Sequence, residues 1–164
     1  MKKTLRSLAF LLTLLPLLSF GQKTEEEAFV KIRRALEYPD TVTILRLGGY
    51  KLRFLPSEIG QLTNLKKLWL YNNELTTLPP EIGQLTNLEE ISLTNNNITS
   101  LPPEIGQLKN LWILNLGDNP LSSLPPEVGQ LKNLSTLSLW GTNIGQIEIS
   151  QLKWKLPNCK IIHD

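Results

Sequence analysis

The 164-residue sequence contains very few of the residue types that most often carry catalysis or bind metals. It has one cysteine, Cys159, and one histidine, His163. A single cysteine excludes an internal disulfide framework, and one cysteine with one histidine cannot supply the ligands of a zinc site. The two residues lie four positions apart, but the tail offers no third group to orient a histidine base. We therefore expect no catalytic residue, no metal and no cofactor.

The sequence also lacks an apolar run long enough to span a membrane. Its longest run, residues 8–18, follows a basic N-terminus and is shorter than the roughly 20 residues that a spanning helix requires. Small residues precede the bond between Gly21 and Gln22, as in a secretory signal peptide. We predict cleavage of residues 1–21, a secreted or otherwise extracytoplasmic protein, and no stable membrane insertion. An uncleaved anchor is the alternative.

No excess of basic residues remains after cleavage. Residues 1–21 hold three of the 17 Lys and Arg and none of the 15 Asp and Glu, which leaves 14 basic and 15 acidic residues. A nucleic-acid partner requires a basic face or stripe, so we expect none. In an exported protein the thiol of Cys159 is free, buried or bonded to a partner. Unpaired cysteines are most often buried and inert.

What the sequence does contain is a unit of 23 residues that recurs along the chain. The segment Glu-Ile-Gly-Gln-Leu starts at residues 58, 81 and 104, and it returns at residue 127 with valine in second place. Around each copy runs the pattern L-x-x-L-x-L-x-x-N-x-L-x-x-L-P. Two weaker units flank three complete ones. The first has Tyr50 and the last has Thr142 in the asparagine position, and the last ends with Ile144 and Ile147.

This pattern resembles the leucine-rich-repeat family, and closely its bacterial branch with the phrase L-P-x-E-I-G-x-L-x-N-L. The resemblance covers about residues 42–147. It implies an α/β fold, a right-handed solenoid with short parallel strands on a concave face and helical or 3-10 turns on a convex face. The concave face is the usual binding surface in this family, so the resemblance also implies a protein partner.

The physical chemistry of the repeat favours the same architecture. Leucines two positions apart point to one side of a short strand, and one unit can bury them only by stacking on its neighbours. A ladder of Asn73, Asn96 and Asn119 would bind backbone groups that otherwise cost about 1–3 kcal/mol each when buried unpaired. The glutamates that open each convex turn suit a helix N-terminus and need no binding role.

The chain divides into four segments: residues 1–21 as signal peptide, 22–40 as an N-terminal capping helix, 41–148 as five repeats, and 149–164 as a C-terminal cap. Thr24 and Glu27 have the spacing of a capping box, which predicts a helix over residues 24–37. At the other end we expect a short helix over residues 150–156 and a strand over residues 160–162.

The candidate binding face consists of the residues that alternate with the buried leucines. Trp69 and Tyr71 should project together with Arg46 nearby, and these are the residue types enriched at binding hot spots. The alternative is that the aromatic rings shield strand edges without any ligand. Trp112 lies just outside the alternation. The candidate residues are Arg46, Lys67, Trp69, Tyr71, Glu90, Ser92, Thr94, Ile113, Asn115 and Trp140.

Charge and size limit what this face can do. Lys66 and Lys67 precede Glu89 and Glu90 by one repeat, which predicts cross-strand pairs worth about 0.2–1 kcal/mol. Five strands give a face of about 320 Å² in projection, against roughly 800 Å² buried per partner in a standard complex. We therefore expect a weak contact, participation of rim loops, or binding as an oligomer.

Three functions are compatible with the sequence. The first is a secreted, non-catalytic protein-binding module. The second is a structural or carbohydrate-binding protein of the cell envelope, because sugars also stack on aromatic rings. The third is an enzyme or reactive-thiol effector, which would require Cys159.

Overall fold

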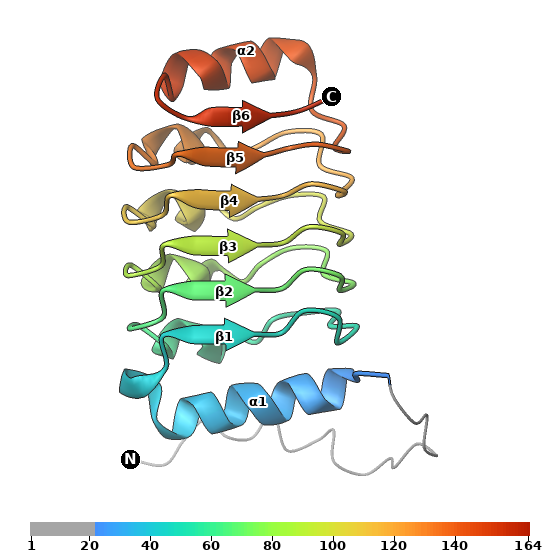
Figure 1. The fold of residues 1–164 in the computed structure, drawn as a ribbon, viewed down its shortest axis with the longest axis vertical. Coiled ribbons are helices and arrows are strands. Elements are labelled where there is room, and N and C mark those ends of the chain that lie inside the picture. The colour runs from blue at the N-terminus through green and yellow to red at the C-terminus, as the bar shows by residue number, and fades with distance from the viewer. Residues whose placement is uncertain (1–21) are drawn as a thin grey trace.

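A computed structural model describes residues 22–164, in which each repeat adds one strand and one short convex turn to an elongated stack (Figure 1). Helix α1 (Glu25–Glu37) covers one end of the stack and helix α2 (Gln146–Lys155) covers the other. The predicted signal peptide lies outside the described residues. Within residues 22–164, neither helix is both long and apolar enough to cross a bilayer.

Six three-residue strands form one parallel sheet in sequence order. Each strand residue pairs with the residue 23 positions later in the chain. The exception is the last pair of strands, in which Thr136 pairs with Lys160. The predicted last strand is confirmed, so the sheet is wider than the five strands used for the area estimate. The strands are β1 (Ile44–Arg46), β2 (Lys67–Trp69), β3 (Glu90–Ser92), β4 (Ile113–Asn115), β5 (Thr136–Ser138) and β6 (Lys160–Ile162).

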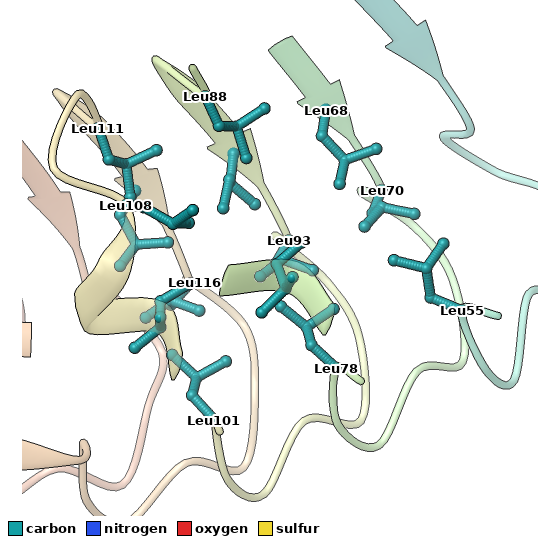
Figure 2. Packing of buried hydrophobic residues seen from close by; sticks show 14 of the residues in the cluster. Leu55, Leu68, Leu70, Leu78, Leu88, Leu93, Leu101, Leu108, Leu111 and Leu116 are labelled. Carbon is teal, nitrogen blue, oxygen red and sulfur yellow. The ribbon is translucent and has the colours of Figure 1, made fainter. Parts of the chain in front are cut away.

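Leucine side chains of successive repeats fill the space between the sheet and the convex turns (Figure 2). Leu68 and Leu70, on either side of Trp69, are fully buried, which confirms the predicted register. Convex 3-10 turns follow the Leu-Pro dipeptides. The proline holds the backbone extended just before the turn, and a second proline is tolerated at the first helical position. These turns span Ser57–Gln61, Pro80–Gln84, Pro103–Gln107 and Pro126–Gln130. The α/β solenoid is therefore confirmed.

The predicted asparagine ladder is buried and saturated with hydrogen bonds. The Asn96 amide donates to the carbonyl oxygens of Leu70 and Leu93 at 3.0 and 2.9 Å, and its oxygen accepts the N–H of Leu75 at 3.1 Å. Asn73 and Asn119 make the equivalent bonds. In the first repeat Tyr50 replaces the asparagine and is itself buried.

A column of left-handed residues directly precedes this ladder. Backbone φ lies between +54° and +80° at Gly49, Asn72, Asn95, Asp118 and Gly141. Only glycine, asparagine and aspartate adopt this conformation at low cost. The column turns the chain out of each strand, and it was not predicted from the sequence.

A second asparagine ladder was not predicted from the sequence either. It lies on the loops that lead into the strands, and each side chain donates to the backbone carbonyl 24 residues earlier in the chain, at 2.7 to 2.9 Å. Because each bond crosses a repeat boundary, this ladder fixes the stacking of neighbouring units from the solvent side. Its members are Asn64, Asn87, Asn110 and Asn133.

The caps follow the expected plan with one correction. The Thr24–Glu27 capping box is present, and α1 buries Ala28, Phe29 and Ile32 on the first repeat. Helix α2, however, begins at Gln146 rather than residue 150, so that Ile147 is a helical residue and not the last buried position of the fifth repeat. The four earlier repeats have Leu-Pro at this place, and three of them have Leu-Pro-Pro, whereas residues 147–149 are Ile-Glu-Ile. Without proline the chain continues as an α-helix.

Candidate functional site

The exposed side of the sheet, which we call the sheet face, carries three columns of side chains. Strand pairing aligns the first two columns as expected: Ile44, Lys67, Glu90, Ile113, Thr136, and then Arg46, Trp69, Ser92, Asn115, Ser138. The third column follows the strands and contains Gly48, Tyr71, Thr94, Gly117 and Trp140. Strand β6 adds Lys160 and Ile162 to the first two columns, and the predicted set lacked both.

Four residues at the β1–β3 end of the face form a connected group, the Trp69 cluster. The Arg46 guanidinium lies 4.7 Å from the centre of the Trp69 ring. The Trp69 indole N–H donates to one Glu90 oxygen at 2.9 Å, and Lys67 pairs with the other at 3.0 Å. The structure therefore brings Arg46, Lys67, Trp69 and Glu90 together. The polar groups of Trp69 and Glu90, however, are already bonded to other groups of the protein.

The predicted cross-strand charge pairing is confirmed. Lys66 and Glu89 lie 3.0 Å apart, directly beside the Lys67–Glu90 pair. These pairs are partly exposed, and such pairs contribute no more than about 1 kcal/mol each. Their main effect is to cancel the charges of Lys66, Lys67, Glu89 and Glu90 within the face.

The Tyr71 ring lies over the backbone of the preceding repeat. Gly48 has no side chain, and a Cβ placed there would stand 2.5 Å from the Tyr71 ring. The ring thus covers the β1 end of the third column and keeps 40% of its surface exposed. Glycine at residue 48 is what permits this position, a dependence that the repeat pattern alone does not reveal.

Two further tryptophans are exposed on opposite edges of the sheet face. Trp140 follows β5 and is 54% exposed, while Trp112 precedes β4 and is 47% exposed. Trp112 borders a cavity of about 430 Å³ together with Lys66, Asn87, Glu89 and Asn110. Aromatic surface therefore flanks the sheet at both strand ends.

The second and third columns of the sheet face are polar and carry no formal charge from β3 to β5. Ser92, Thr94, Asn115 and Ser138 are half-buried. Among the described residues, their side chains take part in no hydrogen bond, unlike those of the Trp69 cluster. Their hydroxyl and amide groups are thus available to a ligand that lies across β3 to β5.

The C-terminal tail does not assemble a nucleophile with a base. His163 lies 3.0 Å from the Lys153 amine through one ring nitrogen and 2.6 Å from the Asp164 carbonyl through the other. Cys159 is half-buried, and burial raises the pKa of its thiol. Nowhere in residues 22–164 do three His, Cys, Asp or Glu side chains gather as metal ligands would.

The Cys159 thiol is expected to react with iodoacetamide several-fold more slowly in the folded protein than in urea at pH 7.5. The thiolate is the reactive form, and a raised pKa lowers its fraction. Alkylation followed by mass spectrometry measures both rates. Faster reaction in the folded protein would instead indicate an activated thiol.

Comparison with known proteins agrees with the geometry. The family described as leucine rich repeats (2 copies) matches residues 63–110 and 86–126. No curated protein matches the chain. Matching solved structures include a leucine-rich-repeat protein of Leptospira interrogans, which is 41% identical with a TM-score of 0.72. The match covers 85% of this chain but 33% of that protein, so the chain spans about a third of its length. The chain is a bacterial leucine-rich-repeat protein.

Proposed function

We propose that the chain is a secreted, non-catalytic protein-binding module that holds its partner against the sheet face. The family supports protein interaction as the general role. The observation that carries the specific proposal is the arrangement of exposed aromatic rings at both edges of an uncharged polar strip. Tyr71 and Trp140 lie at one edge and Trp112 lies at the other.

Within the proposed face we assign different roles to the aromatic residues. Arg46 covers the Trp69 ring and Glu90 accepts its N–H, so the role of Trp69 is to hold the side chains of neighbouring strands in position. Tyr71, Trp112 and Trp140 retain free surface, and rigid aromatic side chains with free surface are typical hot-spot anchors. The free polar groups between them suit the backbone of a bound polypeptide.

The size of the face favours a contact that includes its rim. Six strands at about 4.8 Å spacing give about 410 Å² in projection, still well below roughly 800 Å² per partner. The Trp112 cavity adds area at the loops that lead into the strands. The proposed partner surface therefore extends from Tyr71 and Trp140 across the strip to Trp112.

Secretion is part of the same proposal. It rests on the signal-like residues 1–21. Mass spectrometry of the protein recovered from culture medium tests it. The expected N-terminus is Gln22, whereas recovery only of a cell-retained chain that keeps residues 1–21 would contradict it.

Site-specific photocrosslinking tests the assigned face. A photoreactive amino acid at Asn115 is expected to capture a partner from the culture and its surroundings, whereas one at Gln107, on a convex turn, is not. The double substitution Tyr71→Ala and Trp140→Ala should reduce capture at Asn115 at least about tenfold, because each lost anchor costs more than about 1 kcal/mol. Tyr38→Ala, an exposed tyrosine at the end of α1, is the matched control. Capture only through Gln107, or undiminished capture by the double variant, would refute the proposal.

Carbohydrate binding is a second candidate. The uncharged strip of hydroxyl and amide groups beside Trp140 favours it, since sugars need a stacking surface and several hydrogen-bond partners. Retention on cell-wall glycan, lost in Trp140→Ala and accompanied by no crosslinked protein, would establish this function in place of the first.

A further inference from the structure

Helix α2 presents apolar residues on two opposite sides. Ile149, Leu152 and Leu156 are buried against the last repeats, as a cap requires. Ile147 and Trp154 are 78% and 82% exposed. Ile147 and Trp154 are seven residues apart and therefore lie on one side of the helix. At about 100° per residue, that side is opposite the side whose residues are buried against the last repeats.

This outer surface is unusual for the end of a solenoid. Terminal caps of repeat proteins normally present a polar outer face, which keeps the stack soluble and separate. Helix α1 follows that rule: most of its exposed residues, including Glu26, Lys31 and Arg34, are charged. Helix α2 exposes a tryptophan and an isoleucine instead.

We propose that α2 is the contact of a two-fold dimer, in which the α2 helix of a second copy lies antiparallel across it. In that arrangement Ile147 of each copy meets Trp154 of the other, with Ser150 and Gln151 at the crossing. This strip carries no formal charge, so a symmetric contact brings no like charges together. The inference does not depend on the role of the sheet face.

The surrounding charges favour a second copy over an anionic surface. The Lys153 amine lies 3.0 Å from His163. The stem of Lys155 packs over Gly129, where an added Cβ would stand 2.9 Å from it. Lys153 is thus directed toward the C-terminal tail, and Lys155 is directed toward the last convex turn.

The small contact area predicts a weak dimer. The direction of the two-fold axis places both sheet faces on one side of that dimer. An aromatic residue buries about 150–250 Å², so two side chains per copy give less than the roughly 800 Å² per partner of a standard interface. Figure 1 shows α2 across the end of the stack, with its axis along the direction of the strands. An antiparallel pair of α2 helices therefore requires a two-fold axis perpendicular to the sheet, which leaves both sheet faces on the same side. A dimer of this kind would double the binding surface and add avidity.

Sedimentation velocity of the purified protein between about 1 µM and 1 mM tests this arrangement, since a small interface corresponds to dissociation constants in or near this range. The average mass is expected to rise toward that of a dimer, and Trp154→Glu should shift the transition at least about tenfold higher in concentration. Tyr38→Glu, at the opposite end of the stack, should leave it unchanged. Matching thermal unfolding of the two variants establishes that both are folded.

Crosslinking identifies the surface involved. In a Cys159→Ser background, Ser150→Cys lies at the crossing and should be joined to its mate by a short bismaleimide, whereas Glu26→Cys on α1 should not. A monomer throughout the concentration range, dimerisation unaffected by Trp154→Glu, or crosslinking through Glu26→Cys would each overturn the proposal. Trp154-dependent binding to phosphatidylglycerol vesicles by a monomeric protein would overturn it in favour of a membrane contact.

Discussion

Replacing Asn119 with alanine is expected to lower the free energy of unfolding by about 3–5 kcal/mol, from two or three orphaned buried groups at about 1–3 kcal/mol each. The Asn119 amide donates to the carbonyls of Leu93, Leu116 and Gly117 at 2.9 to 3.1 Å, and its oxygen accepts the Ile98 N–H at 2.9 Å. The side chain is 2% exposed, so water cannot replace these bonds. Urea unfolding followed by circular dichroism measures the loss.

The matched control for this substitution is Asn97→Ala. Asn97 is an exposed asparagine in the neighbouring repeat, and surface changes of this kind usually stay within about 0.5 kcal/mol. Equal losses for Asn97→Ala and Asn119→Ala would show that the ladder does not stabilise the stack through buried hydrogen bonds.

Asn119→Asp adds a test by pH. The new carboxyl would be buried against carbonyl oxygens, which raises its pKa above the ordinary value of about 3.9. The raised pKa means that the neutral form is favoured in the folded state, so stability is greatest at low pH and falls as pH rises through the folded pKa. Asn119→Asp should therefore lose stability relative to Asn119→Ala between pH 4 and pH 8, and a flat difference would contradict the burial of this position.

The sequence was sufficient to predict the structural features that occur in every 23-residue unit. Leu68, Leu70 and Asn96 recur at fixed spacing because every unit buries the same groups, so their positions follow from periodicity. The Thr24–Glu27 capping box was equally readable, because it depends on local spacing alone. The start of α2 was missed, since it depends on an absent proline rather than on a residue that is present.

The contacts of the sheet face could not be predicted in the same way. Trp69 and Tyr71 are neighbours in the alternation, yet one binds Glu90 of the next strand and the other covers Gly48 of the previous strand. Such differences depend on residues of the neighbouring repeats, 21 residues later for Trp69 and 23 residues earlier for Tyr71. A hot-spot assignment from residue type alone therefore gave Trp69 and Tyr71 equal roles, and the structure distinguishes them.

The architecture separates stability from recognition. Stabilising groups, the leucines and the Asn73–Asn96–Asn119 ladder, lie inside the stack, whereas the sheet face contributes small or exposed side chains such as Ser92 and Trp140. Repeat proteins gain most of their stability from contacts between neighbouring units. Substitutions on the face can thus change the partner without loss of the fold, which is what the proposed binding experiments require.

Contacts between units depend on a second buried column, the glycines of the convex turns. Replacing Gly106 with alanine is expected to destabilise the protein by about 2–3 kcal/mol, in the range typical of an overpacked core. An added Cβ would stand 2.6 Å from the Glu127 Cβ and 2.8 Å from the Glu127 carbonyl oxygen. Because these atoms belong to the next turn, relief requires the two repeats to separate.

Gly129→Ala is the matched control, at the equivalent position one repeat later. Its added Cβ would meet the Lys155 side chain at 2.9 Å, and no backbone atom is among its nearest neighbours. A lysine stem can move aside, and removing a glycine restricts the unfolded chain, a gain of about 0.4–1 kcal/mol. Gly129→Ala should therefore be neutral or slightly stabilising in the same urea titration. If both alanines destabilised the protein equally, the cost would arise from the turn itself and not from the close approach of successive repeats.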